Sequence, residues 1–482
     1  MNRDLIIVMG GRILQMAVLL LTLRAMTTRL SPLEVGNFSL LMSIATLFIW
    51  ILISPIGLYM NRHTHEWWQK GTIWINYGRE GLYGIAVAAF TALALSAWQL
   101  LFHPAWAQQL VWLGPAAGLY IICALGNNTI IPAINLFGRR TSYTLLYVTS
   151  QILCLAFSWA FTGFHAAGEY WFFGQTAGFA LASLIALPLF LKVSAPPLGA
   201  ARQSPTDWRK GLAAIAAFCL PITITSGLTW LQFQSYRIVI GDLVSLNFLG
   251  LFFAGYAVSA GIMGAVEITA GQFFGPYFYK HVQEAEPGRQ HDAWAIYMSA
   301  LYPIMIVIVM VVMALARPIT HLLLAPQFWQ ASLYVAVGAM VEGARVLGAA
   351  YGLAAHVSKR TRALLLPHGV GAASIVIFLL GGTWLFGESA VAPAMVAASL
   401  LFLVTMHWVM TRHSGTRISI LGWPWVICVG IFLGALAVLQ PQLAPFGNLA
   451  DIGLVAAGGL AILAAFLLIL RDARPSLSRF TG

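Results

Sequence analysis

The chain has 482 residues, of which 60% are hydrophobic and only 9% are charged, with a net charge of +11. A soluble domain carries roughly 25% charged residues, because its surface has to face water. The composition therefore excludes a soluble enzyme, a disordered chain and a nucleic-acid-binding domain, and it is typical of a polytopic membrane protein.

Long apolar segments alternate with short polar breaks along the whole chain. A helix needs about 20 apolar residues to cross a membrane, and about 14 segments reach that length. In chain order the predicted spans are 5–28, 37–60, 80–101, 109–134, 142–164 and 169–191, then 211–236, 247–270, 292–316, 328–356, 363–386 and 390–410, and finally 421–440 and 450–470. The sequence thus predicts an all-α membrane protein.

The basic residues predict how these spans are oriented. Most of the 26 Lys and Arg residues fall in every second loop, counting from the N-terminus. Cytoplasmic loops of membrane proteins collect Lys and Arg. We therefore expect both termini in the cytoplasm and an even number of spans.

A proline-rich stretch and an internal similarity predict the domain organisation. Pro196, Pro197 and Pro205 oppose helix continuation in 192–210, which we interpret as a cytoplasmic linker. The segments that begin at Gly138 and Ser358 are similar, and so are Val35–Phe38 and Leu249–Phe252. Both matches fit two six-helix lobes in parallel repeat, which face each other across a central cavity. The predicted domains are an N-lobe (1–191), the linker (192–210), a C-lobe (211–411) and a C-terminal helix pair with a short tail (412–482).

A few charges fall inside the predicted spans, where they are costly and usually face a cavity or a partner. Arg12 lies about 10 Å into the first span at 1.5 Å per residue, and no acid stands three or four residues away. Glu342 and Arg345 share one face of the tenth span. This pair is either a structural ion pair or a cavity element whose Arg can be released to an anionic ligand.

Two further arginines stand at similar heights in the first and seventh spans. Arg24 precedes Gly36 by twelve residues, and Arg237 precedes Gly250 by thirteen. If the two guanidinium groups converge, they can bind a phosphate or pyrophosphate. The simpler interpretation is that each arginine extends its charged end to the membrane interface. Glu267, near the predicted end of the eighth span, could carry a proton or pair with an Arg, but a solvated interface position is the interpretation that we favour.

The sequence contains no P-loop, zincin or G-x-S-x-G motif, and its four cysteines have no ligand spacing. We expect no enzymatic activity, no metal site and no cofactor. The candidate substrate-binding residues are Arg12, Arg24, Arg237 and Arg345, and the candidate coupling acids are Glu342 and Glu267.

Two segments resemble the bacterial polysaccharide (Wzx-type) flippase family of the multidrug/oligosaccharidyl-lipid/polysaccharide exporter superfamily. One runs from Arg29 to Ala45 (RLSPLEVGNFSLLMSIA), and the other, 221–258, contains QSYRIVIG and LGLFFAGY. Many members have an acid where this chain has Tyr236, so Arg237 lacks its usual neighbour.

The resemblance implies a two-lobe transporter that flips a lipid-linked oligosaccharide, usually on undecaprenyl pyrophosphate, for polysaccharide biosynthesis. It implies the bacterial cytoplasmic membrane as location and alternating access through a cationic cavity as mechanism. Expected partners are the lipid-linked oligosaccharide and membrane lipid but no nucleic acid, and other polysaccharide-assembly membrane proteins are candidates. In related peptidoglycan-precursor flippases an extra C-terminal helix pair forms a groove for the lipid tail.

Two alternatives remain open. A drug or cation antiporter of the same superfamily would need a cavity acid that exchanges protons. Most of the charged residues inside the predicted spans are instead arginines. A membrane polysaccharide polymerase or ligase typically uses a large external loop, and the predicted external loops are short.

Overall fold

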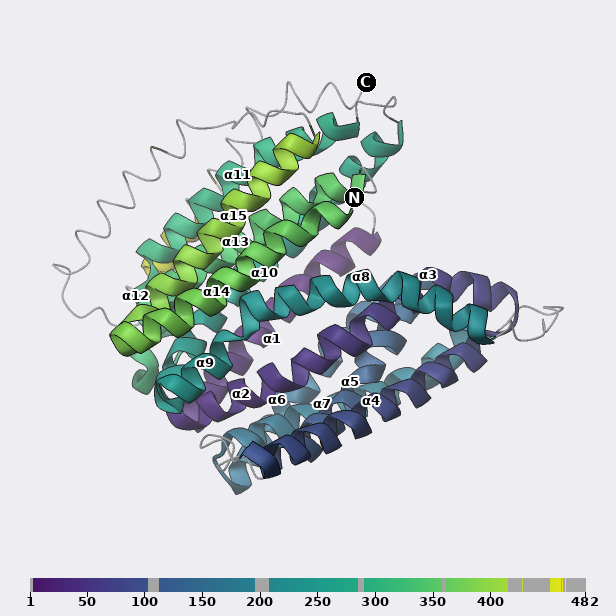
Figure 1. Cartoon of the computed structure of the whole chain (residues 1–482), viewed down its shortest axis with the longest axis horizontal. Coiled ribbons are helices and arrows are strands. Elements are labelled where there is room, and N and C mark those ends of the chain that lie inside the picture. The colour runs from purple at the N-terminus through teal and green to yellow at the C-terminus, as the bar shows by residue number, and fades with distance from the viewer. Residues whose placement is uncertain are drawn as a thin grey trace. The chain divides into compact units, whose positions relative to one another are not determined.

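The computed structural model describes residues 3–102, 112–195, 208–284, 290–357, 361–414, 427, 451–460, 462 and 464. Within these ranges the regular elements are helices, and none is a strand (Figure 1). The predicted all-α architecture is confirmed. A helix satisfies its own backbone N–H and C=O groups, which hydrocarbon cannot do.

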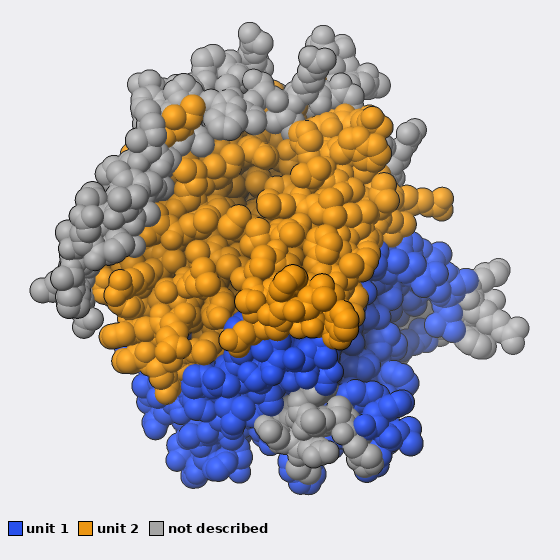
Figure 2. Space-filling view, turned by 60° about the vertical axis from the view of Figure 1, so that its left-hand side comes forward, with its two compact units in different colours: residues 1–250 blue, residues 251–482 orange. Residues whose placement is uncertain are grey.

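The chain divides into two compact units, Met1–Gly250 and Leu251–Gly482 (Figure 2). Unit 1 contains α1 (Arg3–Arg29), α2 (Pro32–Phe48), η1 (Ile49–Ile53), α3 (Ser54–Gln69), α4 (Ile73–Phe102), α5 (Leu113–Leu136), α6 (Arg140–Phe164), α7 (Gly168–Val193), α8 (Trp208–Gln234), α9 (Tyr236–Leu243) and the start of α10 (Leu246–Glu284). Unit 2 contains the rest of α10, α11 (Gln290–Ala314), α12 (Ala316–Leu323), η3 (Pro326–Ala331), α13 (Ser332–Val357), η4 (Thr361–Leu364), α14 (Leu365–Phe386), η5 (Gly387–Ala390) and α15 (Val391–Ser414). The six-plus-six lobes stay a prediction, and residues 196–207 of their linker lie outside the described residues.

Ten helical runs of the described chain are long and apolar enough to cross a membrane. These ten runs cover the predicted spans from the second to the twelfth. One run, Arg362–Arg412, covers two of the spans, because it contains both α14 and α15. The first predicted span corresponds to α1, a helix of 27 residues that is not among these ten runs, so it stays a prediction. The thirteenth lies outside the described residues except for Ile427, and Asp451–Leu460 of the fourteenth is a described apolar helix. The chain is a multi-pass membrane protein.

One predicted span boundary is wrong, and the error concerns an acidic residue. α4 begins at Ile73 rather than near 80, so Glu80 lies inside the helix. The helix α10 continues to Glu284, but its apolar run, Leu246–Ile268, agrees with the predicted eighth span, and Glu267 lies near the end of that run. Hydropathy ends a predicted span at a polar turn such as the one around Glu80, because it measures only apolar content.

A proline-induced defect connects α2 and α3 to α8. The chain passes from α2 to α3 through the π-helical turn η1, and Pro55 stands in the first turn of α3. A proline inside a helix removes the bond to the carbonyl four residues earlier, here that of Ile51. The hydroxyl of Thr223 on α8 donates to the Ile51 carbonyl at 3.1 Å. The defect therefore supplies a bond between helices.

Glycines let α6 and α7 pack backbone to backbone. A Cβ on Gly174 would lie 2.3 Å from Cα of Ser158, and one on Gly178 would lie 2.4 Å from the backbone N of Cys154. The Ser158 hydroxyl donates to the carbonyl of Trp171 at 2.9 Å. Because lipid offers no hydrophobic drive for helix association, close contact of this kind holds the helices together.

The two glycines that the sequence comparison aligned, Gly36 and Gly250, face each other within unit 1. A Cβ on Gly36 would lie 2.0 Å from the carbonyl oxygen of Leu246, and one on Gly250 would lie 1.7 Å from that of Pro32. The first turns of α2 and α10 therefore cross with their backbones in direct contact.

We predict that Gly174→Ala lowers the stability of the protein by about 1–3 kcal/mol or more, because the new methyl group has backbone atoms in its way. Gly163→Ala on α6 is the matched control, since nothing lies within 4 Å of its added Cβ. Thermal unfolding in detergent measures both. Equal melting temperatures for the two variants would contradict the proposed packing.

Candidate functional site

Helix α13 holds the other helices of unit 2 together through polar bonds at several levels. Ser259 on α10 donates to the carbonyl of Val335 at 2.6 Å. The indole Nε1 of Trp294 on α11 donates to the carbonyl of Ala350 at 3.2 Å. Tyr351 bonds with Nδ1 of His407 on α15 at 2.8 Å. These bonds set the register of α13, which carries Glu342 and Arg345.

Small residues bring α10 and α13 close enough for their side chains to meet. A Cβ on Gly255 would lie 2.5 Å from the carbonyl oxygen of Ala331, and one on Gly338 would lie 3.1 Å from Cα of Tyr256. Larger residues would push the helices apart. The glycines therefore allow direct bonds between charged groups on the two helices.

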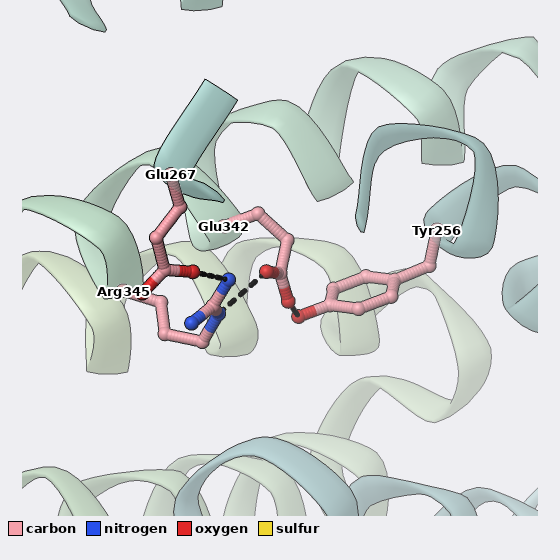
Figure 3. A network of polar contacts seen from close by, with 4 residues as sticks. All are labelled: Tyr256, Glu267, Glu342 and Arg345. Atoms are coloured by element: carbon pink, nitrogen blue, oxygen red, sulfur yellow. Dashed lines mark hydrogen bonds and ion pairs between the residues drawn. The ribbon is translucent and has the colours of Figure 1, made fainter. Parts of the chain in front are cut away.

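A four-residue polar network joins these helices (Figure 3). Arg345 donates from Nε to Oε2 of Glu342 at 2.6 Å and from Nη2 to Oε2 of Glu267 at 2.9 Å. The hydroxyl of Tyr256 donates to the other oxygen of Glu342. One guanidinium thus bridges a carboxylate on its own helix and a carboxylate on α10.

The members of the network differ in burial. The side chain of Glu342 is only 7% exposed, whereas those of Arg345 and Glu267 are 27% and 36% exposed. Arg345 and Tyr256 together satisfy the buried Glu342, as a charge in a poorly solvated site requires. When both acids are ionised, the ion cluster has one negative charge in excess.

The structure confirms the predicted pairing of Glu342 with Arg345. Of the alternatives for Glu267 it shows the pairing with an Arg: Glu267 lies near the end of the apolar run Leu246–Ile268, is 36% exposed and bonds to Arg345. Sequence reasoning gave Tyr256 no polar role. No local pattern could have revealed it, since 86 residues separate Tyr256 from Glu342.

Arg12 lies on α1 in unit 1, in a different setting from Arg345. A Cβ on the adjacent Gly11 would lie 2.0 Å from Cγ2 of Thr144, so α1 packs tightly on α6 there. Arg12 donates from Nη1 to the neutral amide oxygen of Gln15 at 2.7 Å. Among the described residues no acid forms an ion pair with Arg12. Its half-buried charge therefore keeps its attraction for an anion.

Arg24 and Arg237 also belong to unit 1, and both are half-buried. Arg24 stands near the end of α1, whereas Arg237 stands on the short helix α9, which packs against α2. Arg237 donates from Nε to the Tyr236 hydroxyl at 3.2 Å. Tyr236 thus accepts the bond at the position where the flippase resemblance leads one to expect an acid.

Sequence reasoning missed Glu80 as a candidate site residue. The structure places it inside α4 with only 6% exposure, and no described residue bonds to its Oε1. An acid in a membrane span is a signal for function. A predicted boundary at residue 80 concealed that signal.

We predict that Glu342→Ala lowers the free energy of unfolding by about 2–4 kcal/mol, because it leaves Arg345 half-buried with one acid instead of two. Glu267→Ala removes a more exposed partner and is expected to cost less than about 1 kcal/mol. Chemical unfolding in detergent micelles compares the two. A larger loss for Glu267→Ala would show that the buried bond is not the main support of Arg345.

No protein-family model matches the chain, and no curated protein matches its sequence. Among solved structures it is similar to the lipid II flippase MurJ in an inward closed conformation, with 13% identity, 97% of this chain and 99% of that chain covered, and a TM-score of 0.60. It is also similar to a multidrug resistance MATE family transporter of the MOP superfamily in an inward-facing conformation, with 12% identity, coverage of 86% and 100%, and a TM-score of 0.54. The chain therefore has the same fold as these two transporters.

Proposed function

We propose that the chain is a flippase that moves a lipid-linked oligosaccharide across the bacterial cytoplasmic membrane for polysaccharide biosynthesis. The expected lipid carrier is undecaprenyl pyrophosphate, and the expected mechanism is alternating access through a cationic cavity. The MOP fold and the two sequence segments that resemble Wzx-type flippases support this proposal.

The observation that carries the proposal is the state of Arg12. Its guanidinium bonds to a neutral amide, and no described acid pairs with it. A positive charge is costly in a membrane span unless a negatively charged group binds next to it. A pyrophosphate is such a counter-charge, and a guanidinium can bind it with two parallel hydrogen bonds. Arg24 and Arg237 are proposed to bind the same headgroup.

Arg345 has a different role in this proposal. Its Nε and Nη2 are already held by Glu342 and Glu267, so its charge does not attract an anion as strongly as that of Arg12. Protonation of Glu267, the more exposed of the two acids, would free Nη2. We therefore interpret Arg345 as a group that binds substrate only after one acid has taken up a proton.

The contact between Gly36 and Gly250 supports alternating access. Backbones that touch through van der Waals contact can separate without breaking a charged bond. We propose that α2 and α10 separate at this crossing when the cavity opens towards the outside, with both chain termini in the cytoplasm.

A drug or cation antiporter is the second candidate. The excess negative charge of the Glu267–Glu342–Arg345 cluster favours it, because a proton-exchanging acid is what such a transporter requires. The similarity to a MATE family transporter is compatible with it as well.

Leaflet-resolved labelling of lipid-linked oligosaccharide in a strain that lacks the gene tests the proposal. Accumulation in the cytoplasmic leaflet, reversed by the intact gene, is the expected result. Unpolymerised units in the outer leaflet would indicate a polymerase or ligase instead. Normal flipping together with increased drug sensitivity would indicate the antiporter.

We predict that Arg12→Ala abolishes flipping in a complementation assay at a normal protein level, because the carrier phosphates lose a binding group. Arg12→Lys should retain part of the activity, since it keeps the charge but not the planar fork. The control is Arg29→Ala, which removes an exposed arginine of the same helix that stacks on Trp159 at 3.9 Å. Full activity of Arg12→Ala would refute the role assigned to Arg12.

A further inference from the structure

Glu80 occupies a core position of α4. The buried residues of this helix are Ile73, Glu80, Gly84, Val87, Ala88 and Thr91, which follow the helical repeat along one face. A Cβ on Gly84, one turn after Glu80, would lie 2.5 Å from Cδ2 of Leu125, so this face packs on α5. Glu80 therefore stands where a helix normally places an apolar residue.

The Glu80 carboxyl has no described partner. Its Oε1 is buried without a hydrogen bond, and Glu80 takes part in none of the ion pairs among the described residues. Arg79, its neighbour in sequence, is exposed. By contrast, Asn127 on α5 bonds with Ser150 at 2.6 Å and with Ser183 at 3.0 Å. The neighbouring Asn127 is thus hydrogen-bonded, whereas Oε1 of Glu80 is not.

The described residues that line the cavity around Glu80 carry no positive charge. It lines a cavity of about 530 Å³ between α4, α5 and α7, whose described lining is mostly apolar and includes no basic residue. The other titratable groups of the lining are Tyr77 on α4 and Cys123 on α5, and α7 contributes none. On α3 the Thr64 hydroxyl bonds with that of Tyr77 at 3.0 Å, and Glu66 pairs with Lys70.

An ionised carboxylate in such a site would lack both water and a counter-ion, and a buried carboxyl group then takes up a proton instead. We propose that Glu80 is an intramembrane proton-binding site, which is occupied in this conformation. The proton leaves only when water reaches the carboxyl group, so its release accompanies a movement of α4 against α5 and α7.

This site is separate from the network on α10 and α13. Glu342 and Glu267 are both bonded to Arg345. Glu80 has no such cation and holds its proton instead. The inference does not depend on which substrate the protein carries.

The pH dependence of stability tests the proposal, with Glu80→Gln as a mimic of the protonated acid that cannot ionise. If Glu80 is protonated in the fold, raising the pH removes a stabilising proton, so the stability of the wild type falls as the pH rises. We expect the melting temperature of the wild type in detergent to drop below that of Glu80→Gln on going from acidic to alkaline pH. A difference between the two proteins that stays constant over the whole range would overturn the proposal.

A lipid-soluble carbodiimide provides a second measurement, because it reacts with protonated carboxyl groups in apolar surroundings. The cavity is reachable from the lipid side, since Leu184 and Trp74 on its rim are 65% and 49% exposed. Mass spectrometry should find Glu80 modified at neutral pH and much less at alkaline pH. The ion-paired Glu66 and Glu342 are the internal controls and should stay unmodified. Equal modification of Glu66 and Glu80 at every pH would contradict the proposal.

Discussion

Hydrocarbon offers no hydrogen bonds, so every polar group of this chain that leaves water has to be satisfied by the protein. The helical backbone meets this requirement within each segment. Where a proline removes a backbone hydrogen bond, a side chain of another helix can replace it, as the Thr223 hydroxyl does by donating to the carbonyl of Ile51. Charged groups also need partners within the protein, and Arg345 finds two of them in the carboxylates of Glu267 and Glu342. The exceptions to the rule therefore deserve a functional interpretation.

Three ionisable residues of the helices, Arg345, Arg12 and Glu80, meet this constraint in three ways. Arg345 has acidic partners, Arg12 has a neutral amide partner, and Glu80 has no described partner at all. The first is stable as it stands, the second can gain from an anionic ligand, and the third can gain from a proton. In the proposed flippase, Arg12 would bind the anionic headgroup and Glu80 would bind a proton.

Close helix packing is the second consequence of the lipid environment. Without a hydrophobic drive, helices associate through backbone contact, and glycines provide it between α6 and α7 and between α2 and α10. Contacts of this kind give tight packing but few directional bonds. They are compatible with a membrane protein that stays folded while some of its helices separate.

The sequence by itself determined the all-α membrane architecture, because segment length and apolar content depend on each segment alone. The Glu342–Arg345 pair was also predictable, since three residues separate partners on one helix. Only the tertiary structure decided which contacts Glu267, Tyr256 and Glu80 make. The first two bond to residues of α13 that are 78 and 86 positions away in the sequence. Oε1 of Glu80 is buried without a described partner. Contacts between distant helices depend on register and crossing, and hydropathy carries no information about either.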